Sequence, residues 1–196
     1  MARKRKRRGL TFYEEKKKIK PGFWKEVFSY IFYIFMVSLI AFVLVFIFGM
    51  RVSTIGVSME PTLTHGQEVL VNRMSYILFK PDCGDVVAFK PNGNEKSHYY
   101  IKRVIAGPGQ TVQIVGGQIL VDDQPLKKYK FDRIETPGLA ASPYLLGENE
   151  FFVSGDNRNN SEDSRSGNIG AVHRDDIVGR VWFCFAKENI AMGFVK

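Results

Sequence analysis

The sequence has few cysteines and histidines, and this limits the chemistry that it can support. It contains 196 residues but only two cysteines and three histidines. None of them stand at metal-ligand spacing, so we expect no metal site and no disulfide framework. Cys83 and Cys184 lie 101 positions apart, and the sequence leaves open whether they pair or remain buried free thiols.

The sequence also lacks an excess of charge outside its first residues. The formal net charge is +8, yet residues 1–26 hold eleven Lys and Arg against three Glu. The other 170 residues hold 17 basic and 17 acidic side chains. Because a neutral body with a basic leader offers no basic docking face, we expect no nucleic-acid partner.

One long uncharged run follows this leader, from Val27 to Met50, 24 residues in all. As a helix it would span about 36 Å, enough to cross a hydrocarbon core of about 30 Å. A cleaved signal peptide is the competing interpretation, but its apolar region is about half as long. We therefore predict a basic cytoplasmic leader (1–26), a transmembrane anchor (27–50) and, by the positive-inside rule, an extracytoplasmic domain (51–196).

Helical periodicity is absent after the anchor. Short runs of alternating apolar and polar residues are separated by Gly, Pro, Asn and Asp, a pattern typical of β domains. Gly116-Gly117 predicts a hairpin turn, and residues 127–149 predict an irregular insertion. The predicted fold class is all-β, with mainly antiparallel sheets after one N-terminal transmembrane helix. The predicted strands are Glu68–Asn72, Asp85–Phe89, Tyr99–Ile105, Thr111–Val115, Gln118–Val121, Phe151–Ser154 and Ile177–Ala186.

The stretch GVSMEPTL contains a serine, Ser58, that is not part of a GxSxG motif. A catalytic serine needs a base within hydrogen-bond reach. His65 lies seven residues further on, and His98 and His173 occupy polar contexts. A histidine base stays an alternative, although no orienting carboxylate stands at a recognisable position.

A lysine inside an apolar strand is the other candidate base. In HYYIKRVIAGPG, strand alternation places Lys102 on one face with Tyr100 and Val104. Loss of hydration there would lower the lysine pKa and leave a neutral amine that can accept a proton. The alternative, which composition alone favours, is a lysine that reaches solvent from a sheet edge and pairs with a carboxylate.

The stretch FFVSGDNRNNSEDSRSGNIG is typical of a tight loop after a strand. It brings Ser161, Asp163 and Arg165 close together, enough to hold one hydroxyl by charge-assisted hydrogen bonds. The alternative is an ordinary turn whose side chains cap their own backbone.

Three stretches together resemble, in order and spacing, the motifs of bacterial type I signal peptidases. They are VSMEPTL, GDVVAF followed by YYIKRVIAGPG, and SGDNRNNSEDSRSG, and the likeness extends through Ile177–Arg180. The resemblance implies that Ser58 is the nucleophile and Lys102 the general base. It further implies that Ser161 hydrogen-bonds and orients the lysine amine. The supporting residues that it implies are Asp163, Arg165, Asp156 and Arg103, with Asp156 paired to Arg103.

The resemblance also implies the substrate, which is a secreted preprotein cut after a small residue by a membrane-anchored serine endopeptidase without a cofactor. We expect its pocket at Met59, Leu63, Tyr100 and Ile101, and its peptide to bind by strand addition. The Ser58 N–H is the expected oxyanion donor, with Gly56 as a possible second donor. The implied location is the bacterial cytoplasmic membrane, in contact with lipid and near the secretion translocon.

Two departures from the motifs stand out, Gln110 where an aspartate is usual and four residues, Ser166 to Ile169, where about two are expected. Two rival functions also stay open. One is a related Ser/Lys peptidase that processes conjugation or pilus proteins. The other is a non-catalytic, membrane-tethered β scaffold.

Overall fold

The computed structural model describes residues 22–94, 97–126, 132–187 and 191–195. The chain divides into two compact units, Met1–Ala41 and Phe42–Lys196. Most of the predicted basic leader, and residues 127–131 of the predicted insertion, lie outside the described residues.

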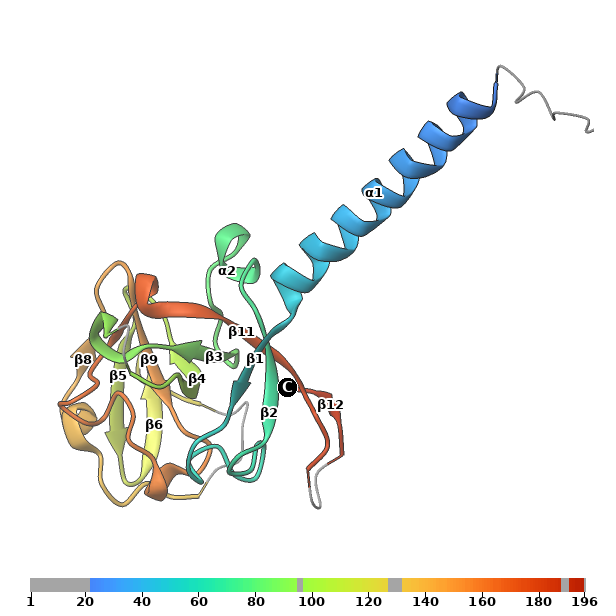
Figure 1. Cartoon of the computed structure of the whole chain (residues 1–196). Coiled ribbons are helices and arrows are strands. Elements are labelled where there is room, and N and C mark those ends of the chain that lie inside the picture. The colour runs from blue at the N-terminus through green and yellow to red at the C-terminus, as the bar shows by residue number, and fades with distance from the viewer. Residues whose placement is uncertain (1–21, 95–96, 127–131, 188–190, 196) are drawn as a thin grey trace, which may run out of the picture. The chain divides into compact units, whose positions relative to one another are not determined.

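Helix α1 covers Phe23–Phe48 (Figure 1), and it has no charged residue from Val27 onward. Its segment Phe23–Phe46 has a mean hydropathy of 2.5 and none of it is buried inside the protein. Within the described part of the chain, it is the one helix long and apolar enough to cross a membrane. A helix this apolar and this exposed is suited to lipid rather than to water.

The larger of two antiparallel sheets carries the functional residues. In the described residues it has eight strands in the order β1-β2-β11-β3-β4-β9-β10, and β12 pairs with β11. Their bounds are β1 Met50–Ser53, β2 Glu68–Asn72, β3 Val86–Phe89, β4 Tyr100–Ala106, β9 Glu150–Ser154, β10 Val172–His173, β11 Ile177–Cys184 and β12 Gly193–Phe194. Because β1 is an edge strand, one side of it is left open to another chain.

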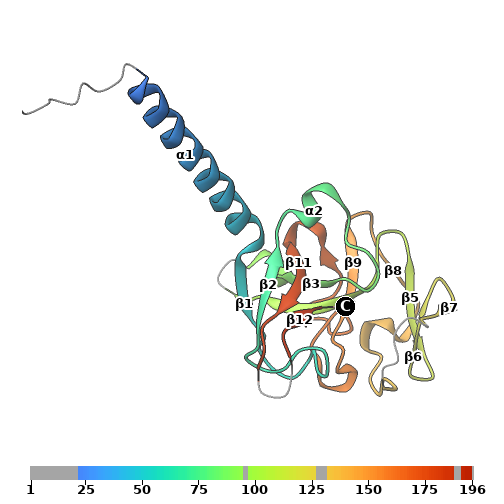
Figure 2. The same ribbon diagram turned by 90° about the vertical axis from the view of Figure 1, so that its right-hand side faces the viewer.

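The smaller sheet has the order β7-β6-β5-β8 among the described residues. Its strands are β5 Thr111–Val115, β6 Gln118–Val121, β7 Gln124–Pro125 and β8 Tyr144–Leu145. Figures 1 and 2 both show it at the end of the domain opposite β1 and β2. The short helices are α2 Ser75–Leu78, η1 Pro91–Gly93, η2 Gly138–Ala141, η3 Arg158–Asn160 and η4 Arg174–Asp176.

The core lies on both faces of β3 and β4, whose residues are almost all buried. On one face, Met59 and Leu63 pack with Val71, Ile101 and Val181. A second cluster, on Val87, Phe89, Val104, Phe151 and Val153, covers the other face. A polar side chain in the middle of β4 is therefore surrounded by apolar groups.

The all-β prediction is confirmed, and each predicted strand has a counterpart. The β2, β5 and β6 bounds match the prediction at both ends. Gly116 and Gly117 form the β5–β6 turn with φ of 58° and 78°, values that glycine adopts without strain. Sequence patterns missed β7, β8, β10 and β12, because strands of two residues are too short to show a period. They also missed β1 and α2, which have four residues each.

Candidate active site

Ser58 lies in a turn that begins five residues after the end of β1. Its carbonyl oxygen accepts a hydrogen bond from the Asn157 N–H at 3.0 Å, and the Asn157 side-chain amide donates to the Val57 carbonyl at 3.2 Å. Asn157 belongs to the loop that follows β9. The loop after β9 therefore holds the Ser58 turn against the sheet.

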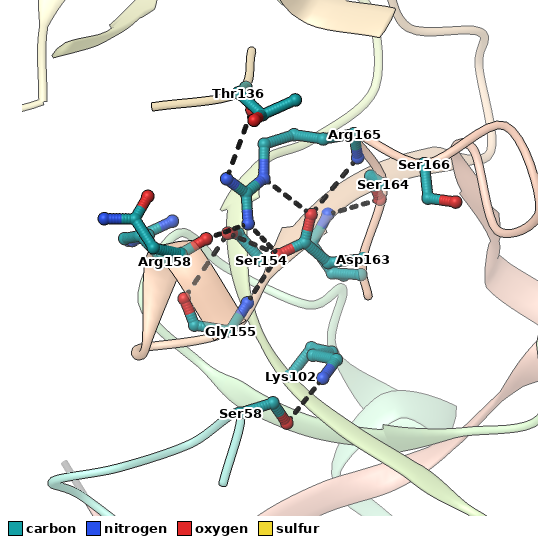
Figure 3. A network of polar contacts seen from close by, with 12 residues as sticks. Ser58, Lys102, Thr136, Ser154, Gly155, Arg158, Asp163, Ser164, Arg165 and Ser166 are labelled. Atoms are coloured by element: carbon teal, nitrogen blue, oxygen red, sulfur yellow. Dashed lines mark hydrogen bonds and ion pairs between the residues drawn. The ribbon is translucent and has the colours of Figure 1, made fainter. Parts of the chain in front are cut away.

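Lys102 lies near the middle of β4, opposite Val87 of β3, and only 4% of its surface is exposed. Its Nζ atom donates a hydrogen bond to Ser58 Oγ at 2.6 Å (Figure 3). Two residues that are 44 positions apart in the sequence are thus in direct contact.

The surroundings of Lys102 favour its neutral form. Burial lowers the pKa of Lys102 from its ordinary value of 10.5 to about 8, and the charge of Arg165 acts in the same direction. The carboxylates of Asp163, Glu162 and Asp156 oppose this shift but do not cancel it. At pH 7 an amine with a pKa of about 8 is neutral in about one molecule in ten, far more often than an ordinary lysine, and the neutral form can accept a proton.

The Oγ atom of Ser161 is buried close to this pair. A Cβ atom added to Gly155 would clash with both Ser161 Oγ and the Ser58 carbonyl oxygen, so glycine is required there. Among the described residues Ser161 Oγ makes no hydrogen bond of normal geometry, but it interacts with the Asp163 carboxylate and helps to lower the pKa of that group. The expected hydrogen bond between Ser161 and Lys102 is not among these contacts, whereas the Lys102 amine does bond to Ser58.

Asp163 and Arg165 form the polar support beneath Ser161. Arg165 donates through Nε and Nη2 to the two oxygens of Asp163, both at 2.8 Å (Figure 3). The Ser154 hydroxyl and the Gly155 N–H also donate to Asp163, at 2.9 Å and 3.0 Å. Burial alone would raise the pKa of Asp163, but Arg165 and the Gly155 N–H outweigh it and hold that pKa below its ordinary value.

Arg103 and Asp156 form the second buried ion pair, as the resemblance implied. Arg103 Nε and Nη2 each contact one Asp156 oxygen at 2.7 Å, and both side chains are almost fully buried. Arg103 also donates to the Gly84 carbonyl at 2.8 Å, and the Thr62 hydroxyl donates to Asp156 at 2.6 Å. The pair links β4, the loop after β9 and the turn that follows Ser58.

We expect Asp156→Asn to lower the free energy of unfolding by about 3 to 5 kcal/mol, because it leaves the Arg103 charge buried without its partner. Chemical unfolding of the full chain in detergent, followed by near-UV circular dichroism, measures this loss. The control is Glu68→Gln, which removes a solvent-exposed ion pair with Arg51 at 3.7 Å. This control should change the stability by less than about 1 kcal/mol. An equally small change for Asp156→Asn would contradict the prediction.

An open groove of about 800 Å³ runs beside the Ser58–Lys102 contact. Tyr100 and Ile101 line it, as expected. Met59 and Leu63 do not, because both are fully buried in the core and have no surface to offer. This part of the prediction is corrected.

Ile55 and Val57 contribute the apolar side chains that Met59 and Leu63 were expected to supply. Both line the groove, and 56% and 43% of their surfaces are exposed. Sequence reasoning missed them, although two apolar residues in alternation directly before Ser58 were a usable signal.

The expected oxyanion donors differ in their availability. No described residue accepts a hydrogen bond from the Ser58 N–H, which leaves it free to bind a ligand. The Gly56 N–H instead donates to His65 Nδ1 at 2.9 Å. Gly56 is therefore not a free second donor, and that expectation is corrected.

The remaining sequence candidates lie elsewhere or contact other groups. His98 lines the groove but is not hydrogen-bonded to Ser58, and His173 belongs to β10. Cys83 and Cys184 are both free thiols. Gln110 donates to Asp122 at 3.0 Å and accepts from the Gly107 N–H at 2.9 Å, so it holds the turn after β4. Among the described residues, no cluster of three His, Cys, Asp or Glu side chains could hold a metal ion.

A comparison with protein families decides the classification. The model of the family "Signal peptidase, peptidase S26" matches residues 26–186. This chain belongs to the peptidase S26 signal peptidase family. The matched range contains both buried ion pairs, the groove and the Ser58–Lys102 contact, and the resemblance inferred from the sequence motifs is confirmed.

Several curated signal peptidases are similar in sequence. A probable signal peptidase I-1 from Synechocystis sp. is 37% identical over 134 residues, which are 65% of this chain and 66% of that protein. A signal peptidase I from Leptolyngbya laminosa is 38% identical over 138 residues, 67% of this chain and 66% of that protein. Signal peptidase IB from Staphylococcus aureus is 33% identical over 166 residues, 74% of this chain and 84% of that protein. The alignments with the first two signal peptidases thus span slightly less than two thirds of those proteins.

Proposed function

We propose that this signal peptidase family member is a membrane-anchored serine endopeptidase that removes N-terminal signal peptides from secreted preproteins. Ser58 is its nucleophile and Lys102 its general base. The single observation that carries the proposal is the 2.6 Å contact between Lys102 Nζ and Ser58 Oγ, made by an amine that is almost fully buried. A scaffold protein has no need of a desolvated amine beside a serine hydroxyl at an open groove.

In the first half of the reaction, the neutral Lys102 amine takes the Ser58 hydroxyl proton while Ser58 Oγ bonds to the scissile carbonyl carbon. The tetrahedral intermediate collapses as the C–N bond breaks, and Lys102 returns the proton to the leaving amine. In the second half, Lys102 takes a proton from water, which attacks the acyl-enzyme. The released Ser58 oxygen then recovers its proton from Lys102.

The negative charge on the intermediate needs donors that are already in place. The Ser58 N–H is free in the described structure and serves this purpose. Since the Gly56 N–H is bonded to His65, any second donor must come from another group. The buried Ser161 hydroxyl supports the Lys102 amine when that amine turns from Ser58 toward the leaving group.

The substrate binds as an added strand along residues 54–57, which continue the edge strand β1. No described residue accepts a hydrogen bond from the N–H groups of Ile55 and Val57, so both are available to a peptide. The side chains of Ile55, Val57, Tyr100 and Ile101 form an apolar wall along the groove. Such a wall suits small side chains near the cut bond, Ala being the expected residue at the first and third positions before it.

Helix α1 anchors the enzyme in the cytoplasmic membrane, with the basic leader on the cytoplasmic side and the β domain on the outer side. The anchor holds the active site where a lipid-embedded signal peptide emerges, close to the secretion translocon. This arrangement replaces a three-dimensional search for the substrate by a local one.

The test uses the full chain in detergent and a preprotein with Ala at the first position before the expected cut. We expect one cut at that site, identified by N-terminal sequencing of the product. Replacing this Ala by Phe should reduce cleavage by at least about tenfold, because a large side chain does not fit the site. Absence of any cut in the Ala preprotein would contradict the proposed function, and equal cleavage of both preproteins would contradict the proposed specificity.

A further inference from the structure

His65 makes a contact that neither the catalytic pair nor the ion pairs explain. Its Nδ1 atom accepts a hydrogen bond from the Gly56 N–H at 2.9 Å. Gly56 lies two residues before Ser58 and lines the groove. In this contact Nδ1 is the acceptor nitrogen of the imidazole ring.

This contact continues the pairing of β1 with β2 by one more step. β1 pairs with β2 up to Ser53 and Glu68. Beyond that point the Thr54 N–H donates to the Gln67 carbonyl at 2.9 Å, and the Gly66 N–H donates to the Thr54 carbonyl at 2.6 Å. The next N–H on that side of the chain belongs to Gly56, and a side chain, His65, accepts its hydrogen bond in place of a backbone carbonyl.

Gly56 is also the most adaptable point of this segment. Its φ is +79°, and a Cβ atom added to it would meet nothing within 4 Å, so the surrounding protein does not hold it by packing. On the side of Ser58, the next hydrogen bond to the backbone is the one that the Asn157 side-chain amide donates to the Val57 carbonyl. Without the hydrogen bond to His65, no hydrogen bond among the described residues would hold the backbone between Thr54 and Val57.

We propose that His65 is a positioning residue, which fixes Gly56 and through it the strand that receives the peptide and the turn that carries Ser58. The inference rests on the proposed function, because positioning matters only if this segment binds and cuts a peptide. His65 itself is held at its carbonyl oxygen, which accepts a hydrogen bond from Lys187 Nζ at 2.7 Å. The backbone of His65 is therefore held in place while its imidazole binds the Gly56 N–H.

Two substitutions of His65 test the inference, one that keeps a hydrogen-bond acceptor near the position of Nδ1 and one that removes it. His65→Asn keeps an acceptor oxygen near the position of Nδ1, whereas His65→Leu removes the acceptor and keeps an apolar side chain of moderate size. The matched control is His173→Leu. His173 is also exposed and its Nδ1 also accepts a backbone N–H, that of Asp175 at 3.4 Å, but it does not line the groove.

We expect His65→Leu to reduce kcat/KM for the preprotein by about three- to tenfold, the range that one lost hydrogen bond supplies. His65→Asn and His173→Leu should stay within about twofold of the unsubstituted chain. An equal loss in His65→Asn and His65→Leu, or no loss in His65→Leu, would overturn the inference.

A second measurement does not depend on cleavage. Backbone hydrogen exchange of the full chain in detergent, followed on peptides that cover residues 54–58, should become faster in His65→Leu and stay unchanged in His65→Asn. Unchanged exchange in His65→Leu would overturn the positioning role even if the chain cleaves preproteins. Faster exchange in a chain that cuts no preprotein would contradict the proposed function alone.

Discussion

Replacing Lys102 by methionine, or Ser58 by alanine, is expected to lower kcat/KM for preprotein cleavage by at least about a thousandfold. Methionine keeps the apolar stem of the lysine but has no amine, so no group can take the Ser58 proton. Alanine removes the attacking oxygen. Because the two side chains act as one unit through the 2.6 Å contact, the double substitution should be no worse than either single one.

The same substitution has a second expected effect, on stability. Lys102 has a folded-state pKa of about 8 against an ordinary value of 10.5, so the folded chain disfavours the charged amine. The resulting loss of folding stability is absent above pH 10.5, grows as the pH falls toward 8, and is complete below pH 8. It amounts to roughly 3 kcal/mol. Relative to Lys102→Met, the unsubstituted chain should thus lose about this much stability between high pH and pH 7.

Both effects are measured on the full chain in detergent, by preprotein cleavage and by chemical unfolding followed with near-UV circular dichroism. Lys80→Met is the matched control, because Lys80 is an exposed lysine outside the groove. It should leave cleavage unchanged. A Lys102→Met chain that is folded and cleaves at a near-normal rate would rule out the lysine as the base.

The sequence predicted the central pair because each residue carries a local signal. Lys102 stands in an apolar strand, and its two neighbours in the chain are buried. Strand alternation made a poorly hydrated amine one of two interpretations, beside a lysine that reaches solvent. The match of several motifs then linked it to Ser58, 44 positions away. The Arg103–Asp156 pair followed from the same match.

The groove was harder to predict because a turn has no period. Residues 58–63 follow the strand as a turn, and nothing in their order shows which side chains face the core. Met59 and Leu63 were therefore placed in the groove although the core encloses them, while Ile55 and Val57 were overlooked.

The role of His65 could not be predicted either, because its contact depends on a turn that returns the chain to Gly56. Sequence reasoning considered His65 only as a base for Ser58. In the structure its Nδ1 atom is bonded to the backbone instead. The resemblance placed Ser161 beside Lys102, but no local pattern showed that its Oγ atom would be buried against Gly155.

The pH dependence of kcat/KM for preprotein cleavage tests the central claim most directly, namely that the neutral Lys102 amine is the base. Burial sets the pKa of Lys102 at about 8, and protonation below that pH removes the base. We expect kcat/KM to rise about tenfold per pH unit from pH 5 to 8, roughly a thousandfold in all, and then to level off. Near-UV circular dichroism at each pH controls for unfolding. A rate that is constant from pH 5 to 9 while the chain stays folded would contradict the account.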